Sequence, residues 1–96
     1  MSIAIDLRGE KALVTGAGAG IGREIAIWLA EAGASVAVND LVPERTESVV
    51  KEITHNGGEA YAVPADCRDD TAVDELVKRS VVVMGGLSIA LSLIHI

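Results

Sequence analysis

The sequence predicts an α/β fold in which helices cover both faces of a parallel sheet. Short apolar runs alternate with stretches of helical periodicity, and glycine or proline punctuates the turns between them. Half of the 96 residues are apolar, phenylalanine is absent, and the chain holds one tryptophan, Trp28, and one tyrosine, Tyr61. The core must therefore be built from small and aliphatic side chains, as is typical of sheets buried on both faces.

The first half of the chain predicts a strand, a helix and a second strand. Residues 11–16 (KALVTG) form an apolar run ended by glycine, which suits a buried parallel strand. Helical spacing follows as far as the stop signal Gly33. Residues 35–40 (SVAVND) are a β-branched run that ends in polar residues and predicts the second strand. The inward face of the helix is expected to hold Ile21, Ile25, Leu29 and Ala32.

The second half repeats the alternation. Pro43 suits the first turn of a helix that breaks at residues 56–58 (NGG), and residues 59–64 (EAYAVP) alternate like a strand. A third helix, begun by Asp69 or Asp70, ends at glycines 85–86, and a fourth strand should start near Leu87. The expected inward faces are Val42, Thr46, Val49, Val50 and Ile53 for the second helix, and Val73, Leu76, Val77 and Ser80 for the third.

Alternating strands and helices at this spacing imply right-handed crossovers and a doubly wound parallel sheet over residues 1–90. The order is βαβαβα plus the start of a fourth strand, so the sheet is truncated. Ligands of such sheets bind beyond the carboxyl ends of the strands, where the strand order reverses.

Charge and cysteine content exclude several classes of protein. The net charge of −6 argues against a nucleic-acid binder or an anionic-membrane binder. Residues 80–96 are uncharged but somewhat short for a membrane span, and the start of the chain lacks the pattern of a signal peptide. A single cysteine, Cys67, excludes an internal disulfide and fits a reducing, cytoplasmic setting. The histidines and carboxylates show no metal-binding spacing, so no metal is expected.

Residues 14–23 (VTGAGAGIGR) predict a phosphate-binding loop. A helix N-terminus attracts phosphate through its unpaired N–H groups. Gly16 can turn the chain off the strand, Gly20 can let a pyrophosphate approach, and Gly22 can let the helix pack closely on the strand. Gly18 is included among the expected cofactor-binding residues, although the spacing gives it no separate duty. The alternative is a plain turn; a mononucleotide P-loop is excluded because no Gly-Lys-Ser/Thr ending follows.

An acidic residue at the end of the second predicted strand indicates which dinucleotide is bound. The Asp40 carboxylate can accept hydrogen bonds from both hydroxyls of an adenine ribose and would repel a 2′-phosphate. NAD is therefore favoured over NADP, with Arg23 the nearby cation that keeps NADP open. The alternative for Asp40 is that it only caps a turn before Pro43.

Asp66 and Cys67 end the third predicted strand on the same edge. Asp66 could accept a hydrogen bond from the adenine amino group, and the backbone N–H of Cys67 could donate to a ring nitrogen. The alternative is a strand-end aspartate beside a small buried cysteine. A catalytic Cys67 is not expected, because neither His55 nor His95 partners it in a recognisable pattern.

Residues 15–22 (TGAGAGIG) resemble the TGxxxGIG cofactor motif of the classical short-chain dehydrogenase/reductase family, and the resemblance extends over residues 7–87. It implies a Rossmann fold, a nicotinamide cofactor, an oxidoreductase that transfers hydride between an alcohol and a ketone, and a homodimer or homotetramer. The 3-oxoacyl carrier-protein reductase branch is the most similar. The resemblance implies that the pyrophosphate lies against Gly16, Gly20, Ile21 and Gly22, the ribose against Asp40, and the adenine against Asp66 and Cys67.

The catalytic residues of that family have no counterpart here. The family uses a serine and a Tyr-x-x-x-Lys pair, in which the lysine lowers the pKa of the tyrosine so that it can act as acid or base. Tyr61 is followed by AVPA, so no such pair occurs. No catalytic residue is assigned, and no turnover is expected from this chain.

The closing residues 91–96 (LSLIHI) resemble translated adapter sequence from transposase-based sequencing libraries and are expected to be a non-native tail. The chain is then the N-terminal cofactor-binding half of a dehydrogenase, and poor solubility or self-association is expected because an open sheet edge is left. Two alternatives stay open: a stand-alone, non-catalytic dinucleotide-binding module, and a Rossmann-like protein for another adenosyl ligand such as S-adenosylmethionine.

Overall fold

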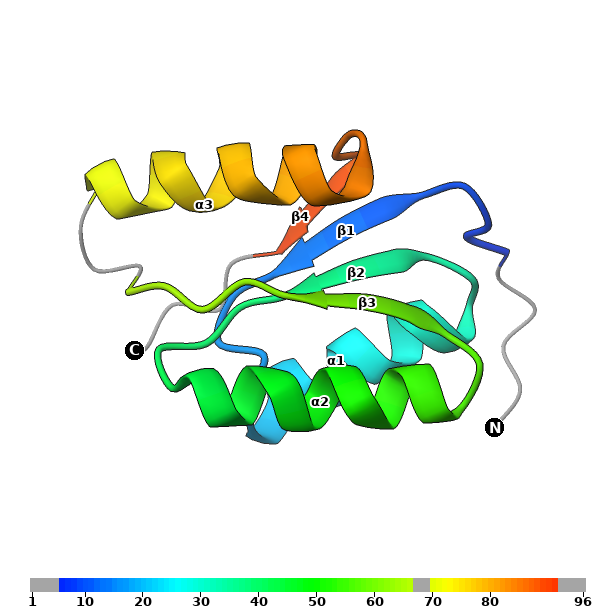
Figure 1. Cartoon of the computed structure of the whole chain (residues 1–96). Coiled ribbons are helices and arrows are strands. Elements are labelled where there is room, and N and C mark those ends of the chain that lie inside the picture. Colours follow the sequence, from blue (N-terminus) through cyan, green and yellow to red (C-terminus); the bar gives the residue numbers. More distant parts are fainter. Residues whose placement is uncertain (1–5, 67–69, 92–96) are drawn as a thin grey trace.

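The computed structural model describes residues 6–66 and 70–91, which form a parallel sheet and three helices in strict alternation (Figure 1). The predicted order is confirmed. The elements are β1 (Lys11–Val14), α1 (Gly20–Glu31), β2 (Ser35–Val38), α2 (Pro43–His55), β3 (Glu59–Ala62), α3 (Asp70–Met84) and β4 (Ile89–Leu91).

The first three strands are each two residues shorter at their carboxyl ends than the sequence pattern suggested. β1 ends at Val14 because the chain turns at Gly16, which has a φ of +63°. β2 ends at Val38, so Asn39 and Asp40 belong to the following connection. β3 ends before Pro64, whose ring nitrogen has no hydrogen to donate to a ladder. The residues that were expected at the strand ends therefore lie in the loops beyond the sheet, where ligands of such folds bind.

The sheet has the strand order β3-β2-β1-β4, and every neighbouring pair is parallel. The chain steps outward from β1 to β3 and then crosses back to place β4 on the other side of β1. In register, Val14 pairs with Val38 of β2 and with Leu91 of β4. The strand order therefore reverses at β1, and the topological switch point lies at its carboxyl end.

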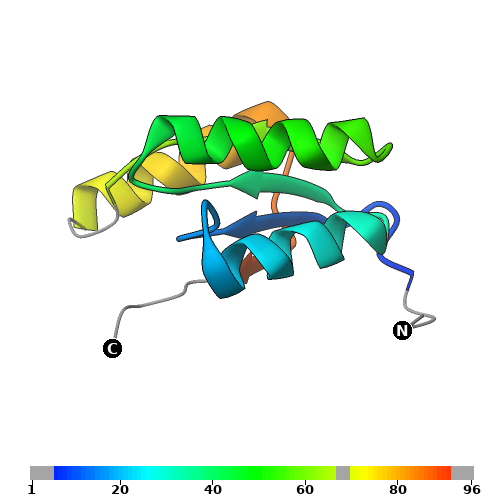
Figure 2. The ribbon, with the colours of Figure 1, turned by 90° about the horizontal axis from the view of Figure 1, so that it is seen from below.

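The two faces of the sheet are covered unequally. α1 and α2 lie side by side on one face, and α3 lies alone on the other (Figures 1 and 2). Successive strand residues point to opposite faces. Ala12, Val14, Val36 and Val38 join the buried cluster under α1 and α2, whereas Leu13 and Ala37 join the smaller cluster under α3.

The inward faces of the first and third helices differ from the sequence expectation. In α1 the buried residues are Gly22, Ala26, Leu29 and Ala30, while Ile21 is 74% exposed. The stripe is rotated because Gly22 and Ala26 let the helix backbone approach the sheet, which turns the larger isoleucine outward. In α2 the expected Thr46, Val49 and Ile53 are buried.

In α3 the buried positions are Leu76, Ser80 and Met84, and the expected Val73 and Val77 are each 37% exposed. A single helix resting on a sheet buries only the narrow stripe that touches it, so the flanking valines stay in contact with water. None of the described helices is long and apolar enough to cross a membrane.

Candidate functional site

Three connecting segments meet at the carboxyl edge of the sheet: residues 15–19 after β1, residues 39–42 after β2 and residues 63–66 after β3. Backbone hydrogen bonds join them. The Ala17 N–H donates to the Asn39 carbonyl at 2.7 Å, and the Ala65 N–H donates to the Asp40 carbonyl at 3.2 Å. The structure thus brings the glycine loop, Asp40 and the segment ending at Asp66 to one edge, while Cys67 lies outside the described residues.

The glycine loop uses glycine for its backbone conformation at two points. Gly16 and Gly20 have φ values of +63° and +59°, in the left-handed region that side-chain-bearing residues rarely adopt. A Cβ built at Gly20 would meet nothing within 4 Å, so the space beside this residue is open. Gly20 also begins α1, so this open space lies at the helix N-terminus.

The N-terminus of α1 can accept an anion. Its N-cap residue, Ala19, is extended and makes no side-chain capping hydrogen bond, and the first turn holds no acidic residue. By contrast, α2 carries Glu44 in its first turn. A helix of 12 residues presents a partial positive charge and unpaired N–H groups at such an end, which is where a pyrophosphate would bind.

Arg23, the cation nearest in sequence to this loop, is occupied by other partners. Its guanidinium donates to the Glu24 carboxylate at 2.9 Å and to the Glu52 carboxylate of α2. The pair with Glu52 is part-buried, whereas the pair with Glu24 is exposed. Arg23 therefore links α1 to α2.

The Asp40 side chain is half-buried beside the glycine loop. Its Oδ2 accepts a hydrogen bond from the Val42 N–H at 3.0 Å, immediately before α2 begins at Pro43. The turn-capping alternative is thus present in the structure, and it holds the carboxylate in place. A carboxylate has about four acceptor positions, so one backbone hydrogen bond leaves capacity for the hydroxyls of a ribose.

Gly18 has a role that the sequence did not reveal. A Cβ built there would lie 2.7 Å from Asp40 Cγ and 2.6 Å from Arg45 Cβ. Any side chain would therefore push Asp40 and the first turn of α2 away from the loop. Gly18 brings the expected ribose-binding carboxylate close to the expected pyrophosphate-binding loop, a contact between distant segments that no sequence spacing signals.

Asn39 is a second residue that sequence reasoning missed. It is 1% exposed, and its Nδ2 donates to the Val63 carbonyl at 2.9 Å and to the Ala65 carbonyl at 3.4 Å. The only signal in the sequence was a polar residue directly after a β-branched run. Asp66, one residue beyond Ala65, is half-buried at the same edge.

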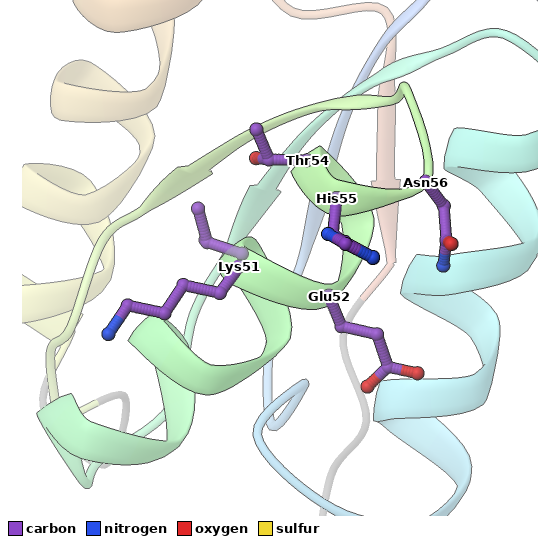
Figure 3. Close-up of a pocket in the computed structure, with 6 residues that line it drawn as sticks. Lys51, Glu52, Thr54, His55 and Asn56 are labelled. Carbon is purple, nitrogen blue, oxygen red and sulfur yellow. The ribbon is translucent and has the colours of Figure 1, made fainter.

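Two surface depressions lie at the opposite edge of the sheet. One, of about 610 Å³, is formed by the last turns of α2 (Figure 3) and is lined by Val50, Lys51, Glu52, Thr54, His55 and Asn56. Figure 3 shows Lys51 and Glu52 pointing apart, so the polar groups do not converge on one point. Within residues 6–66 and 70–91, no three His, Cys, Asp or Glu side chains gather as a metal site would require.

Tyr61 lies within β3, where it pairs with Ala37 of β2. Its hydroxyl donates to the Glu59 carboxylate at 3.1 Å, and this hydrogen bond raises the pKa of Tyr61. An acid–base tyrosine that works near neutral pH needs a lowered pKa. The direction of this shift is the opposite of the one that such a tyrosine needs.

The parallel order β3-β2-β1-β4, with a glycine loop and a helix N-terminus at the switch point, defines a Rossmann-type nucleotide-binding fold. A family model described as short chain dehydrogenase matches residues 10–91. The chain belongs to the short-chain dehydrogenase/reductase family, whose members are oxidoreductases that bind a nicotinamide dinucleotide.

Curated relatives agree with this assignment. The chain is 42% identical over 83 residues to a 2,3-dihydro-2,3-dihydroxybenzoate dehydrogenase of Bacillus subtilis, and equally identical over the same length to a 7alpha-hydroxysteroid dehydrogenase of Escherichia coli. Each alignment covers 86% of this chain and 32% of the relative. The chain thus spans about a third of the length of these relatives. They differ in named substrate, so the 3-oxoacyl reductase branch stays a prediction.

Solved structures match the fold closely. A dehydrogenase/reductase from Sinorhizobium meliloti superposes with a TM-score of 0.92 at 41% identity, covering 97% of this chain and 37% of that one. A 7alpha-hydroxysteroid dehydrogenase in complex with NADH and 7-oxo glycochenodeoxycholic acid gives a TM-score of 0.88 at 40% identity, covering 91% of this chain and 34% of that one.

Proposed function

We propose that this chain is the cofactor-binding half of a dehydrogenase that transfers hydride between an alcohol and a ketone, and that it prefers NAD to NADP. The observation that carries the proposal is the meeting of the glycine loop, the uncapped N-terminus of α1 and the Asp40 carboxylate at the switch point of the sheet. When bound, a nicotinamide cofactor supplies a hydride donor or acceptor.

The residues of the carboxyl edge fit such a cofactor. Gly16, Gly20, Ile21 and Gly22 would surround the pyrophosphate at the start of α1, where the space beside Gly20 is open. Gly18 would keep the loop and Asp40 together. Asp66 and Cys67 would bind the adenine, as the family resemblance implies.

The preference for NAD rests on charge at the ribose. Asp40 is held against the loop by Gly18 and by the Val42 N–H, so a 2′-phosphate would meet a fixed negative charge. Arg23 is engaged by Glu24 and Glu52 and offers no compensation. The Cβ of Arg45 and the Cγ of Asp40 lie against the same point of the glycine loop, at Gly18. Arg45 is therefore the cation that would weaken the preference for NAD.

Calorimetric titration of the 96-residue chain with NADH and NADPH tests this proposal. We expect saturable NADH binding and NADPH binding weaker by about tenfold or more, since like-charge contacts cost several kcal/mol and 1.4 kcal/mol is tenfold. Asp40→Ser should weaken NADH binding and remove most of the preference. Glu47→Gln, which neutralises an exposed carboxylate further along α2, should change neither affinity.

Two results would contradict the proposal. Equal affinity of the unaltered chain for NADH and NADPH would remove the NAD preference, and absence of any saturable NADH binding would remove the cofactor-binding function. Reduction of NAD with simple alcohols by this chain would show that catalytic residues are present, against the expectation that none lies within it.

A stand-alone binding module is the second candidate, and one observation favours it. β4 pairs in register with β1, from Ala12 with Ile89 to Val14 with Leu91, and so covers the open edge of β1. The half-sheet thus has the fourth strand that such a module would need, and β4 becomes the edge strand on that side. Both candidates expect NADH binding without turnover, so a sharp, reversible two-state unfolding of a monomer is the result that would favour the module.

A further inference from the structure

Asn39 connects all three segments of the carboxyl edge. Its backbone N–H donates to the Val14 carbonyl at 3.0 Å, and its backbone carbonyl accepts from the Ala17 N–H at 2.7 Å. Any residue could make those two bonds. The side chain adds two that are specific to asparagine, from Nδ2 to the Val63 carbonyl at 2.9 Å and to the Ala65 carbonyl at 3.4 Å.

The 63–66 segment, which accepts these side-chain hydrogen bonds, lies beyond the end of the β2–β3 ladder. The β2–β3 ladder ends where Val38 pairs with Ala62, and Pro64 has no N–H with which to extend it. The Val63 and Ala65 N–H groups tie this segment back to the Val38 and Asp40 carbonyls, and the Arg79 guanidinium of α3 donates to the Pro64 carbonyl at 3.2 Å. The Asn39 amide adds a connection from a residue that is 1% exposed, and its hydrogen bond to the Val63 carbonyl is buried and so well shielded from water.

We propose that Asn39 is a positioning residue for the adenine end of the cofactor site. Its side chain holds the 63–66 segment at the depth and angle at which Asp66 can accept a hydrogen bond from the adenine amino group. The same residue ties that segment to the glycine loop, so the adenine and pyrophosphate subsites keep a fixed separation. This inference rests on the proposed function.

The test uses two probes that differ at position 6 of the purine and at the neighbouring N1. ADP carries the amino group that Asp66 is expected to bind, whereas inosine diphosphate carries at position 6 an oxygen that a carboxylate would repel, together with a hydrogen on N1. We expect the unaltered 96-residue chain to bind ADP about tenfold more tightly or better, which is the discrimination of one hydrogen bond to a charged group. In Asn39→Ala the preference should fall close to unity, with affinity for inosine diphosphate little changed.

Ser80→Ala is the matched control. Ser80 is fully buried on α3, and its Oγ donates to the Leu76 carbonyl at 2.8 Å, so this substitution also removes one buried side-chain hydrogen bond, but away from the site. We expect it to lower stability to a degree similar to that of the Asn39 variant and to leave the preference for ADP unchanged. A purely structural role for Asn39 would make both variants behave alike.

A second variant and a second measurement cover the case in which Asn39→Ala does not fold. Asn39→Ser keeps a small polar side chain that is too short to reach both carbonyls. Amide hydrogen exchange in this variant should become faster at Val63 and Ala65 while the central ladder at Leu13 and Val36 keeps its protection.

The outcomes separate the two proposals. If the unaltered chain binds neither NADH nor ADP, the proposed function fails and the role of Asn39 fails with it. If the chain binds ADP and inosine diphosphate equally, if the Asn39 variants keep the preference for ADP, or if exchange at Val63 and Ala65 is unchanged, only the role of Asn39 is overturned.

Discussion

The face of the sheet under α1 and α2 differs from the face under α3 in how completely it is shielded from water. Two helices, fastened to each other by the Arg23–Glu52 ion pair, cover the first face, and its buried cluster runs through both helices and two strands. One helix covers the second face, its buried cluster is smaller, and several valines of that helix are exposed. The face under α1 and α2 is therefore fully covered, whereas the face under α3 is only partly covered.

The carboxyl edge of the sheet is well formed even though only one helix covers the second face. The glycine loop, α1 and the start of α2 belong to the fully covered face, and they contribute the expected pyrophosphate and ribose subsites. Only the 63–66 segment extends toward α3, through Val63, which packs in the smaller cluster. The expected adenine subsite therefore depends on both faces.

The largest expected effect compares one buried residue from each face. Ile53→Ala on α2 should lower the free energy of unfolding by about 2–5 kcal/mol, because it removes a large aliphatic side chain that is 3% exposed and leaves a cavity. Leu76→Ala on α3 also removes a deeply buried side chain, which is 1% exposed, but it should cost less, toward about 2 kcal/mol, because a single covering helix can move toward the sheet and shrink the cavity. Urea denaturation followed by circular dichroism measures both. Equal losses would mean that the two faces are packed equally well.

The exposed valines of α3 predict an intermediate effect, on association rather than on folding. Val82 is 79% exposed, and Val73, Val77, Val81 and Val83 are each more than a third exposed. An apolar patch of this kind favours self-association. Replacing Val77, Val81 and Val82 together by glutamine should shift the chain toward monomer in sedimentation velocity and change the free energy of unfolding by only about 0.5 kcal/mol per site.

Val50→Gln provides the contrast from the other face. Val50 is partly buried and packs on the cluster beneath α2. We expect this single substitution to destabilise the fold without reducing association. If the triple valine variant of α3 associates as strongly as the unaltered chain, the exposed valines do not form the self-association surface. The two faces would then differ only in how well they are packed.

The smallest expected effect is a pH dependence on the α3 face of the sheet. Ser35 and Tyr61 both donate hydrogen bonds to the Glu59 carboxylate, and with the nearby charge of Lys11 they lower the pKa of Glu59 below its usual range. Because the pKa is lower in the folded state, the stabilisation is present above the ordinary glutamate range and is lost as the pH falls through the folded value.

Unfolding measured between roughly pH 6 and pH 3 tests this expectation, with about 4.3 as the ordinary pKa of glutamate. Glu59 is exposed, so the loss should be small and should shrink further at high salt. Glu59→Gln should remove that part of the pH dependence. An unchanged slope in this variant would assign the acid sensitivity to other carboxylates, such as Asp6, whose pKa the Arg8 guanidinium lowers to about 2.

The alternation of elements, the parallel sheet, the family and the segments that form the carboxyl edge could all be predicted from the sequence. These follow from local causes: the period of apolar residues, the backbone freedom of glycine at Gly16 and Gly20, and the punctuation by Pro43 and Gly33. The hydrogen-bonded turn at Asp40 could also be predicted from the sequence, because its partner Val42 lies only two residues away.

Three features depend on the folded chain: which way α1 and α3 face, the crowding at Gly18 and the side-chain hydrogen bonds of Asn39. Rotation of a helix by one residue depends on how closely its backbone approaches the sheet, and Gly18 is crowded by residues more than twenty positions away. The Asn39 amide finds its acceptors on the 63–66 segment, equally distant along the chain. Such contacts exist only after the strands have paired, because the hydrogen bonds and close approaches join segments whose separation the sequence does not encode locally.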